Sequence, residues 1–138
     1  SPDTKFSLEK MFKSLRSESS NSEKIKSSQV STLSISGLSC HWFTATPNVS
    51  ESVFKPFVFT ENARISPLTV FDPAKDPNWT VLGKYHSSRD WNQVGDLLKS
   101  LEETCINEVK EVLASDCDPS ELDDLMKDCV EAEVKFYR

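Results

Sequence analysis

HWFTATP, at residues 41–47, and SVFKPFVF, at residues 52–59, carry the strongest β-strand signal in this chain. The first stretch is rich in aromatic residues and threonine, which favour a strand, and Pro47 ends it. The second is almost wholly apolar, but Pro56 in its middle cannot donate a hydrogen bond to a neighbouring strand. We therefore expect the second stretch to form an edge strand or an extended strap across the core.

A further strand is predicted just before these two stretches. Residues 30–35 include an alternation of polar and apolar side chains, which Gly37 then interrupts. Strands over 30–35 and 41–46, joined by a short glycine-containing turn, predict an antiparallel β-hairpin. A two-stranded hairpin is not stable alone, so these strands need to pair with further strands that the chain does not supply. We expect a missing partner segment.

The remaining elements are predicted to be helical. Residues 2–16 place Leu8, Met11, Phe12 and Leu15 on one helical face. A second apolar stripe runs from residue 91 to about 115, with Ser87 or Ser88 as its cap. Asp118 and Pro119 then begin another helix as its cap and first helical residue, so the last two helices form a helical hairpin.

Residues 60–88 have no clean period and contain three prolines. We expect a long ordered connection with these apolar side chains buried: Phe71, Trp79, Val81, Leu82 and Tyr85. The predicted class is therefore α+β, in the order helix, β-hairpin, apolar strap, irregular connection and helical hairpin. The chain is predicted to be a single domain or the C-terminal segment of a larger one. Its two parts are residues 1–89 and the acidic hairpin of residues 90–138.

The charge is unevenly distributed along the 138 residues. The chain carries a net charge of −6, and residues 90–138 alone hold fourteen acidic and five basic side chains. This balance argues against nucleic acid as a partner, because phosphates favour clustered lysine and arginine. The acidic helices are interpreted as a solvated surface, with a docking surface for a basic partner as the alternative. No apolar run is long enough to span a membrane.

Residue patterns typical of an active site or a metal site are not found. Cys40 and His41 are adjacent on a predicted strand, so they point to opposite faces and cannot form a nucleophile–base pair. His86 is interpreted as a surface residue. The carboxylates over residues 116–124 lack the glycine and loop length of a calcium site. We expect no metal site and no cofactor.

The four cysteines show no metal-ligand spacing and are interpreted as reduced thiols: Cys40, Cys105, Cys117 and Cys129. No leader peptide is visible, which favours a cytoplasmic protein. Two glycosylation sequons, at Asn48 and Asn78, favour secretion instead. The chain opens with Ser1-Pro2 rather than methionine, so we expect a processed product, an excised fragment or a chain trimmed of a tag.

The block over residues 41–59 resembles the secernins, a branch of the C69 dipeptidase family. The specific part is a strand ending in Thr44-Ala45-Thr46-Pro47, followed by the stretch Ser52 to Phe57. The order of a helix before this block and charged helices after it is also similar. The stretch Ile25 to Gln29 departs from the Thr-Thr-x-Ser-Met pattern of the family.

The resemblance implies an N-terminal-nucleophile hydrolase fold, with two antiparallel sheets between helix layers. It also implies a cysteine nucleophile at the mature N-terminus, whose own α-amino group acts as the base. Ser1 begins a helical pattern instead of a buried strand, so we assign no catalytic residue to this chain and do not expect it to be active alone. Lys55 is the one candidate substrate-binding residue, because it could reach a substrate carboxylate.

Two functions follow from these expectations. The first is the structural C-terminal segment of a cysteine-type dipeptidase or amide hydrolase. Its partners would be the N-terminal portion that carries the nucleophile, and a short peptide or amide substrate. The alternative is a non-catalytic interaction or regulatory protein linked to exocytosis, which uses the acidic helical hairpin to recruit a partner.

Overall fold

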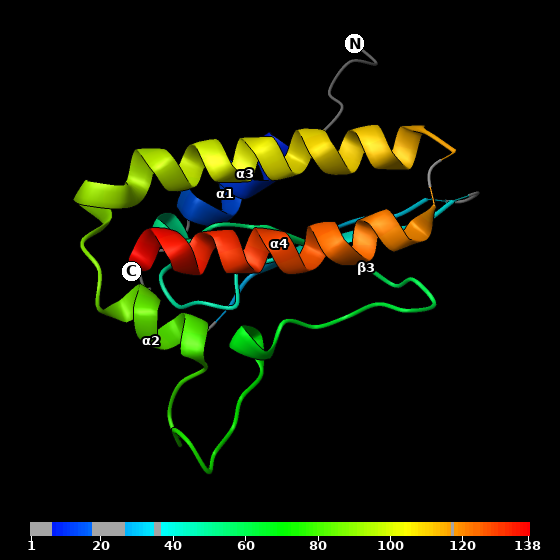
Figure 1. Ribbon diagram of the computed structural model, residues 1–138. Coiled ribbons are helices and arrows are strands. Elements are labelled where there is room, and N and C mark those ends of the chain that lie inside the picture. The colour runs from blue at the N-terminus through cyan, green and yellow to red at the C-terminus, as the bar shows by residue number, and fades with distance from the viewer. Residues whose placement is uncertain (1–6, 18–26, 35–36, 117) are drawn as a thin grey trace.

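The computed structural model describes residues 7–17, 27–34, 37–116 and 118–138. The start of the predicted first helix, Ile25–Lys26, Ile35–Ser36 and Cys117 lie outside the described residues. The fold is α+β, as predicted, with a small antiparallel sheet and a pair of long helices in front of it (Figure 1). In chain order the elements are α1 (Leu8–Ser17), β1 (Gln29–Thr32), β2 (Cys40–Phe43), η2 (Val49–Glu51), β3 (Lys55–Val58), η3 (Pro67–Thr69), α2 (Val81–Ser87), α3 (Trp91–Ala114) and α4 (Pro119–Tyr137).

The three strands form one antiparallel sheet in the order β1-β2-β3. The predicted hairpin is confirmed, with Val30 opposite Trp42. β3 pairs with the other side of β2 and places Pro56 opposite Trp42. The prediction of an edge strand is therefore confirmed, because β3 lies at one end of the sheet. Both hairpin strands are shorter than predicted, and β2 ends before Ala45, which has a left-handed φ of 55°.

The two faces of the sheet have different surroundings. One face is buried against α1, α3 and α4 in a common apolar core. Within this core the ring of Phe12 stacks on Phe54 with centroids 4.1 Å apart. The other face, which we call the aromatic face, carries four ring side chains: His41, Phe43, Phe57 and Phe59. The register also places Gln29, Ser31 and the buried Lys55 on this side of the sheet. Phe59 is 72% exposed, so the apolar stretch of residues 52–59 is not buried along its whole length.

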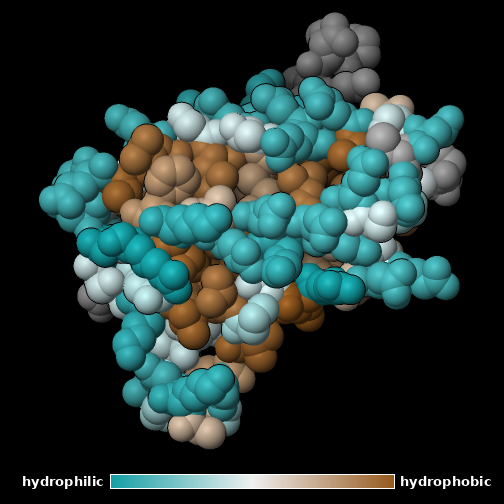
Figure 2. Space-filling view, viewed as in Figure 1, coloured by the Kyte–Doolittle hydropathy of each residue, from teal (hydrophilic) through white to brown (hydrophobic). Residues whose placement is uncertain are grey.

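The helical hairpin is confirmed, and α3 and α4 lie side by side across the sheet (Figure 1). Asp118 caps α4 by accepting a hydrogen bond from the backbone N–H of Ser120, and Pro119 lies in the first turn, as predicted. The cap of α3 is Asp90 and not Ser87 or Ser88. Rows of hydrophilic side chains follow the outer sides of both helices (Figure 2).

The connection over residues 60–88 differs most from expectation. It contains η3 and a helix, α2, whose cap Thr80 accepts a hydrogen bond from the backbone N–H of Gly83. Of the five apolar side chains expected to be buried, only Leu82 is fully buried, whereas Phe71 is 50% exposed and Trp79 is 40% exposed. The prediction that these aromatic residues are buried is wrong. Among the described residues no helix has the length and apolar character needed to span a membrane.

Candidate functional site

Lys55, the predicted substrate-binding residue, lies in the interior of the protein. It is the first residue of β3, and its side chain is fully buried. Its Nζ lies 2.5 Å from Oε2 of Glu133 on α4 and donates a hydrogen bond to the backbone carbonyl of Val53. The ammonium group also lies 5.9 Å from the centroid of the Phe43 ring. A substrate role for Lys55 stays a prediction, and in this arrangement its charge is neutralised by Glu133.

The pair continues through Tyr137 to the protein surface. The hydroxyl of Tyr137 lies 2.8 Å from Oε1 of Glu133 and 3.1 Å from Nδ1 of His86. Glu133 and Tyr137 are one turn apart on α4, and His86 comes from α2. His86 is half-buried, which corrects the interpretation of a surface residue. We call these four residues the buried polar chain: Lys55, Glu133, Tyr137 and His86.

Burial dominates the electrostatics of this chain. Removal from water raises the pKa of Glu133, although the nearby Lys55 acts in the opposite direction. Burial also raises the pKa of Tyr137, and the Glu133 carboxylate raises it further. For His86, burial and the Lys55 charge both lower the pKa. Burial therefore disfavours the charged forms of both the carboxyl and the imidazole, while Lys55 stabilises the Glu133 carboxylate with which it pairs.

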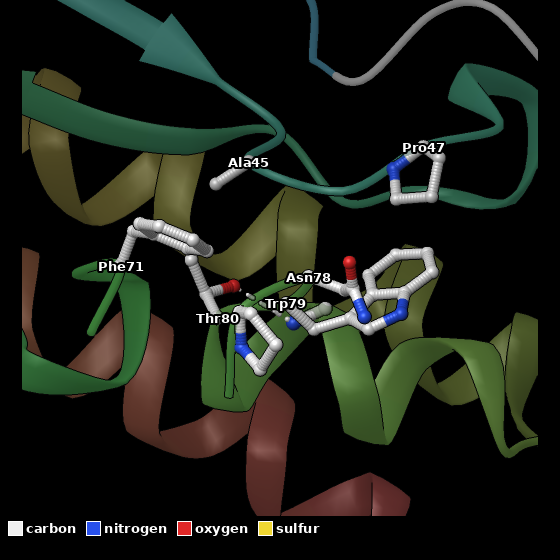
Figure 3. A pocket seen from close by; sticks show the side chains of 8 residues that line it. Ala45, Pro47, Phe71, Asn78, Trp79 and Thr80 are labelled. Carbon is white, nitrogen blue, oxygen red and sulfur yellow. Dashed lines mark hydrogen bonds between the residues drawn. The ribbon is translucent and has the colours of Figure 1, made fainter. Parts of the chain in front are cut away.

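A pocket of about 670 Å³ lies beside the outer end of the buried polar chain. Phe71 and Trp79 face it from opposite sides, and Ala45 and Pro47 close it from the loop after β2 (Figure 3). A Cβ at Gly83 would lie 3.0 Å from the Trp79 ring, so glycine lets this ring pack on α2. The remaining lining residues are Pro77, Asn78 and Thr80. The lining offers apolar contact and one amide, and it contains no titratable side chain.

Buried hydroxyl groups shape the pocket wall. The loop from residue 44 to 52 contains two residues with left-handed backbone, Ala45 and Asn48. Thr46 Oγ1 lies 2.7 Å from Ser52 Oγ. The single hydroxyl proton of Ser52 faces the backbone carbonyls of Asn48, at 2.8 Å, and Pro47, at 3.1 Å. These contacts satisfy carbonyls that a tight loop leaves without a partner. The Thr-x-Thr-Pro motif therefore holds the loop against the pocket.

The described cysteines are poor nucleophiles in this structure. Cys40, Cys105 and Cys129 are free and buried. Burial raises the pKa of Cys40 to about 12, and contact with the Cys105 thiol, together with burial, raises the pKa of Cys129. His41 does not contact the Cys40 thiol through its ring and instead lies 2.9 Å from Ser31 Oγ. Among residues 7–17, 27–34, 37–116 and 118–138, no group of three histidine, cysteine or acidic residues has the arrangement of a metal site.

Sequence reasoning missed three members of the buried polar chain. Glu133 lies among the buried apolar residues of α4, and an acidic residue at such a position was the available signal. Tyr137 binds Glu133 one turn before it on α4, but its other partner, His86, is 51 residues away in the chain. His86 had no signal, because α2 itself was not predicted.

A second, partly exposed ion pair joins α1 to α3 near the start of β3. Arg16 of α1 binds Glu102 through both guanidinium nitrogens, and it also donates to the backbone carbonyl of Ser52. Glu102 accepts a further hydrogen bond from the backbone N–H of Phe54. This ion pair connects α1 and α3 to the residues that directly precede β3. Glu102 is not among the residues that line the pocket of Figure 3.

No model of a known protein family matches the chain, and no solved structure matches it.

Proposed function

We propose that this chain is the structural C-terminal segment of a secernin-like, cysteine-type N-terminal-nucleophile hydrolase. The reaction would be hydrolysis of short peptides or other amides, with the nucleophile on an N-terminal portion. In this proposal the chain completes one sheet of an αββα sandwich. Its helices would form one outer layer.

The observation that carries the proposal is the unequal burial of the two sheet faces. Helices cover one face, whereas the aromatic face is half-buried and Phe59 is 72% exposed. Large apolar side chains on an exposed face favour contact with another protein segment. A second sheet packed on this face would supply the layer that the sandwich requires. The outer edge of β1 could also accept a strand, because β1 is at the end of the sheet.

The described thiols are consistent with a nucleophile located elsewhere. Nucleophilic cysteines have a lowered pKa, whereas Cys40 and Cys129 have raised values. The pocket beside Trp79 has no acid or base in its lining. A hydrolase that used this pocket would need its reactive groups from another segment.

An activity assay with defined components tests the proposal. We expect the chain alone to show no amide hydrolysis on a panel of dipeptides and short peptide amides. Combining it with its N-terminal portion should give turnover, which replacement of the N-terminal cysteine by alanine abolishes. Turnover by the chain alone would contradict the proposal, and so would a combined protein that lacks turnover although the two portions bind.

The alternative is a non-catalytic protein that recruits a basic partner. One observation favours it: five carboxylates from α3 and α4 line a common groove with Val112 and Leu125. They are Glu108, Glu111, Glu121, Asp124 and Asp128. Such a groove would bind a basic amphipathic peptide with an affinity that falls as salt is added. Salt-sensitive capture of such a peptide without turnover of the combined protein would favour this second function.

A further inference from the structure

A separate pocket lies on the helix-covered side of the sheet, between α1, α3 and the end of the β-hairpin. Its volume is about 310 Å³, and it shares no lining residue with the pocket of Figure 3. Three buried residues form its floor, Cys40 and Trp42 of β2 and Val109 of α3. Its walls are apolar and partly exposed: Leu8, Leu38 and Leu113. We call this site the Trp42 pocket.

The floor of the Trp42 pocket contains a hydrogen-bond donor without a partner. The indole Nε1–H of Trp42 is buried, and no group among the described residues accepts a hydrogen bond from it. The other buried side-chain atom without a hydrogen bond, Oε2 of Glu133, has the Lys55 ammonium 2.5 Å away. Buried donors in native proteins nearly always have an acceptor, and an indole can only donate. A molecule in the pocket that Trp42 lines can supply the missing acceptor.

The charges around the pocket favour an uncharged ligand. At the rim, Nζ of Lys110 lies 3.3 Å from Oε1 of Glu9, so these two charges compensate each other. The floor is neutral, because burial raises the pKa of the Cys40 thiol to about 12. The described lining residues carry no other charge. A charged group placed at the floor would be buried without a partner, which is unfavourable.

The polar group of the ligand should accept a hydrogen bond without donating one. Trp42 offers one N–H, while Cys40 and Val109 offer no carbonyl or carboxylate side chain to an incoming donor. A ketone or ester carbonyl satisfies this condition, whereas an amide or alcohol brings an N–H or O–H of its own. A cavity of about 150 Å³ holds one benzene molecule. The Trp42 pocket therefore has room for a chain of roughly six to ten carbon atoms.

We propose that the Trp42 pocket binds an uncharged ketone or ester of medium chain length, whose carbonyl oxygen accepts the hydrogen bond of Trp42 Nε1–H. The apolar chain of the ligand lies along Leu38 and Leu113, which are 41% and 39% exposed in the free protein. Binding gives the indole its acceptor and removes both leucines from water. The pocket is on the opposite side of the sheet from the aromatic face, so the proposal does not depend on the hydrolase assignment.

Nuclear magnetic resonance with 2-heptanone, labelled with ¹³C at its carbonyl, tests the proposal. The chain has three tryptophans, and the indole N–H signals of Trp79 and Trp91 are internal controls. We expect a saturable downfield shift of the Trp42 Nε1–H signal, accompanied by a downfield shift of the ligand carbonyl, while both controls stay unchanged. The proposal is overturned if the Trp42 signal does not move up to the solubility limit, or if all three indoles move together. A bound water that stays on Nε1–H at saturating ketone would also overturn it.

Three variants separate specific binding from general apolar contact. Trp42→Phe removes the donor and keeps a ring, so the ketone should bind about three- to tenfold more weakly and its carbonyl shift should disappear. Leu113→Glu places a charge on the exposed wall and should weaken binding about tenfold or more. Leu97→Glu is the matched control, because Leu97 is also exposed on α3 but lies outside the pocket. If Trp42→Phe is unfolded, the two leucine variants still decide. Equal binding by Leu113→Glu and Leu97→Glu would overturn the proposal.

Discussion

The Lys55–Glu133 and Arg16–Glu102 pairs join the same kinds of groups in different surroundings. Both side chains of the first pair are fully buried, whereas Arg16 in the second pair is 27% exposed. The partly exposed pair anchors backbone groups at Ser52 and Phe54. The buried pair connects instead to two more titratable side chains, Tyr137 and His86. One ion pair therefore connects backbone segments, and the other places two opposite charges in the interior beside Tyr137 and His86.

Among these variants, Lys55→Met is expected to lower the free energy of unfolding the most. This change leaves the Glu133 carboxyl without its cation in a dry site, and loss of one partner of a buried pair costs about 3–5 kcal/mol of unfolding free energy. Urea denaturation measures the difference. The double variant Lys55→Met/Glu133→Leu is the matched control and should recover most of the loss. A single variant as stable as wild type would contradict the comparison.

A smaller loss is expected from Glu102→Ala. Arg16 can turn toward water, but the buried backbone N–H of Phe54 is left without its acceptor. An unsatisfied buried donor costs about 1–3 kcal/mol, so the same urea assay should give a loss in this range. Arg16→Met is the control, because it keeps the acceptor for Phe54. It should cost less than Glu102→Ala, and the reverse order would show that the guanidinium is the more important partner.

Local patterns predicted much of the fold, but contacts between distant residues could not be read from them. Asp118 and Pro119 sit beside the helix that they begin, and Pro56 limits its own strand to an edge. Lys55 and Glu133 are 78 residues apart. The sequence around Lys55 and the sequence around Glu133 give no sign that the two side chains form an ion pair.

Two further differences have local causes. The helix α2 spans only seven residues, which is too short for an apolar period to be visible. Thr80 was its one available signal, as a capping residue. Trp79 was predicted to be buried because aromatic residues usually are, yet it forms a pocket wall. An exposed aromatic side chain in a loop has no sequence signature of its own.

Tyr137→Phe should affect the Lys55–Glu133 site alone. The change removes one hydroxyl that lies between Glu133 and His86 and leaves the ring in place. We expect a loss of about 0.5–1.5 kcal/mol in unfolding free energy, the net contribution of a typical hydrogen bond. The spectra of Arg16 and Phe54 should not change. Altered signals at those residues would mean that the two sites are coupled, contrary to the comparison.

The dependence of stability on pH should also distinguish the sites. His86 has a folded pKa below its value of 6.5 in the unfolded chain, so the unfolded state binds more protons near that pH. Its contribution to stability is present above pH 6.5 and is lost as the pH falls through the lowered folded pKa. Measuring the free energy of unfolding of His86→Gln and of wild type from pH 5 to 8 isolates the part of its pH dependence that comes from His86. A dependence of stability on pH that is the same in His86→Gln as in wild type would contradict the assignment.

The smallest expected difference is the response to salt. Arg16 is partly exposed, so ions can screen its interaction with Glu102, while the dry Lys55–Glu133 pair is screened much less. Double-mutant cycles at low and high salt measure the coupling within each pair. The coupling of Arg16 with Glu102 should fall by a few tenths of a kcal/mol, and that of Lys55 with Glu133 should not change. A larger salt effect on the buried pair would reverse the comparison.

The proposed role as half of a hydrolase is tested most directly by native mass spectrometry of the protein isolated from its source. The account predicts a second polypeptide bound to this chain in a one-to-one complex, and its first residue should be cysteine. Substitution of Phe57 and Phe59 by serine should release that polypeptide, because these residues form the aromatic face. A stable monomer of these 138 residues, with no partner at any concentration tested, would contradict the account.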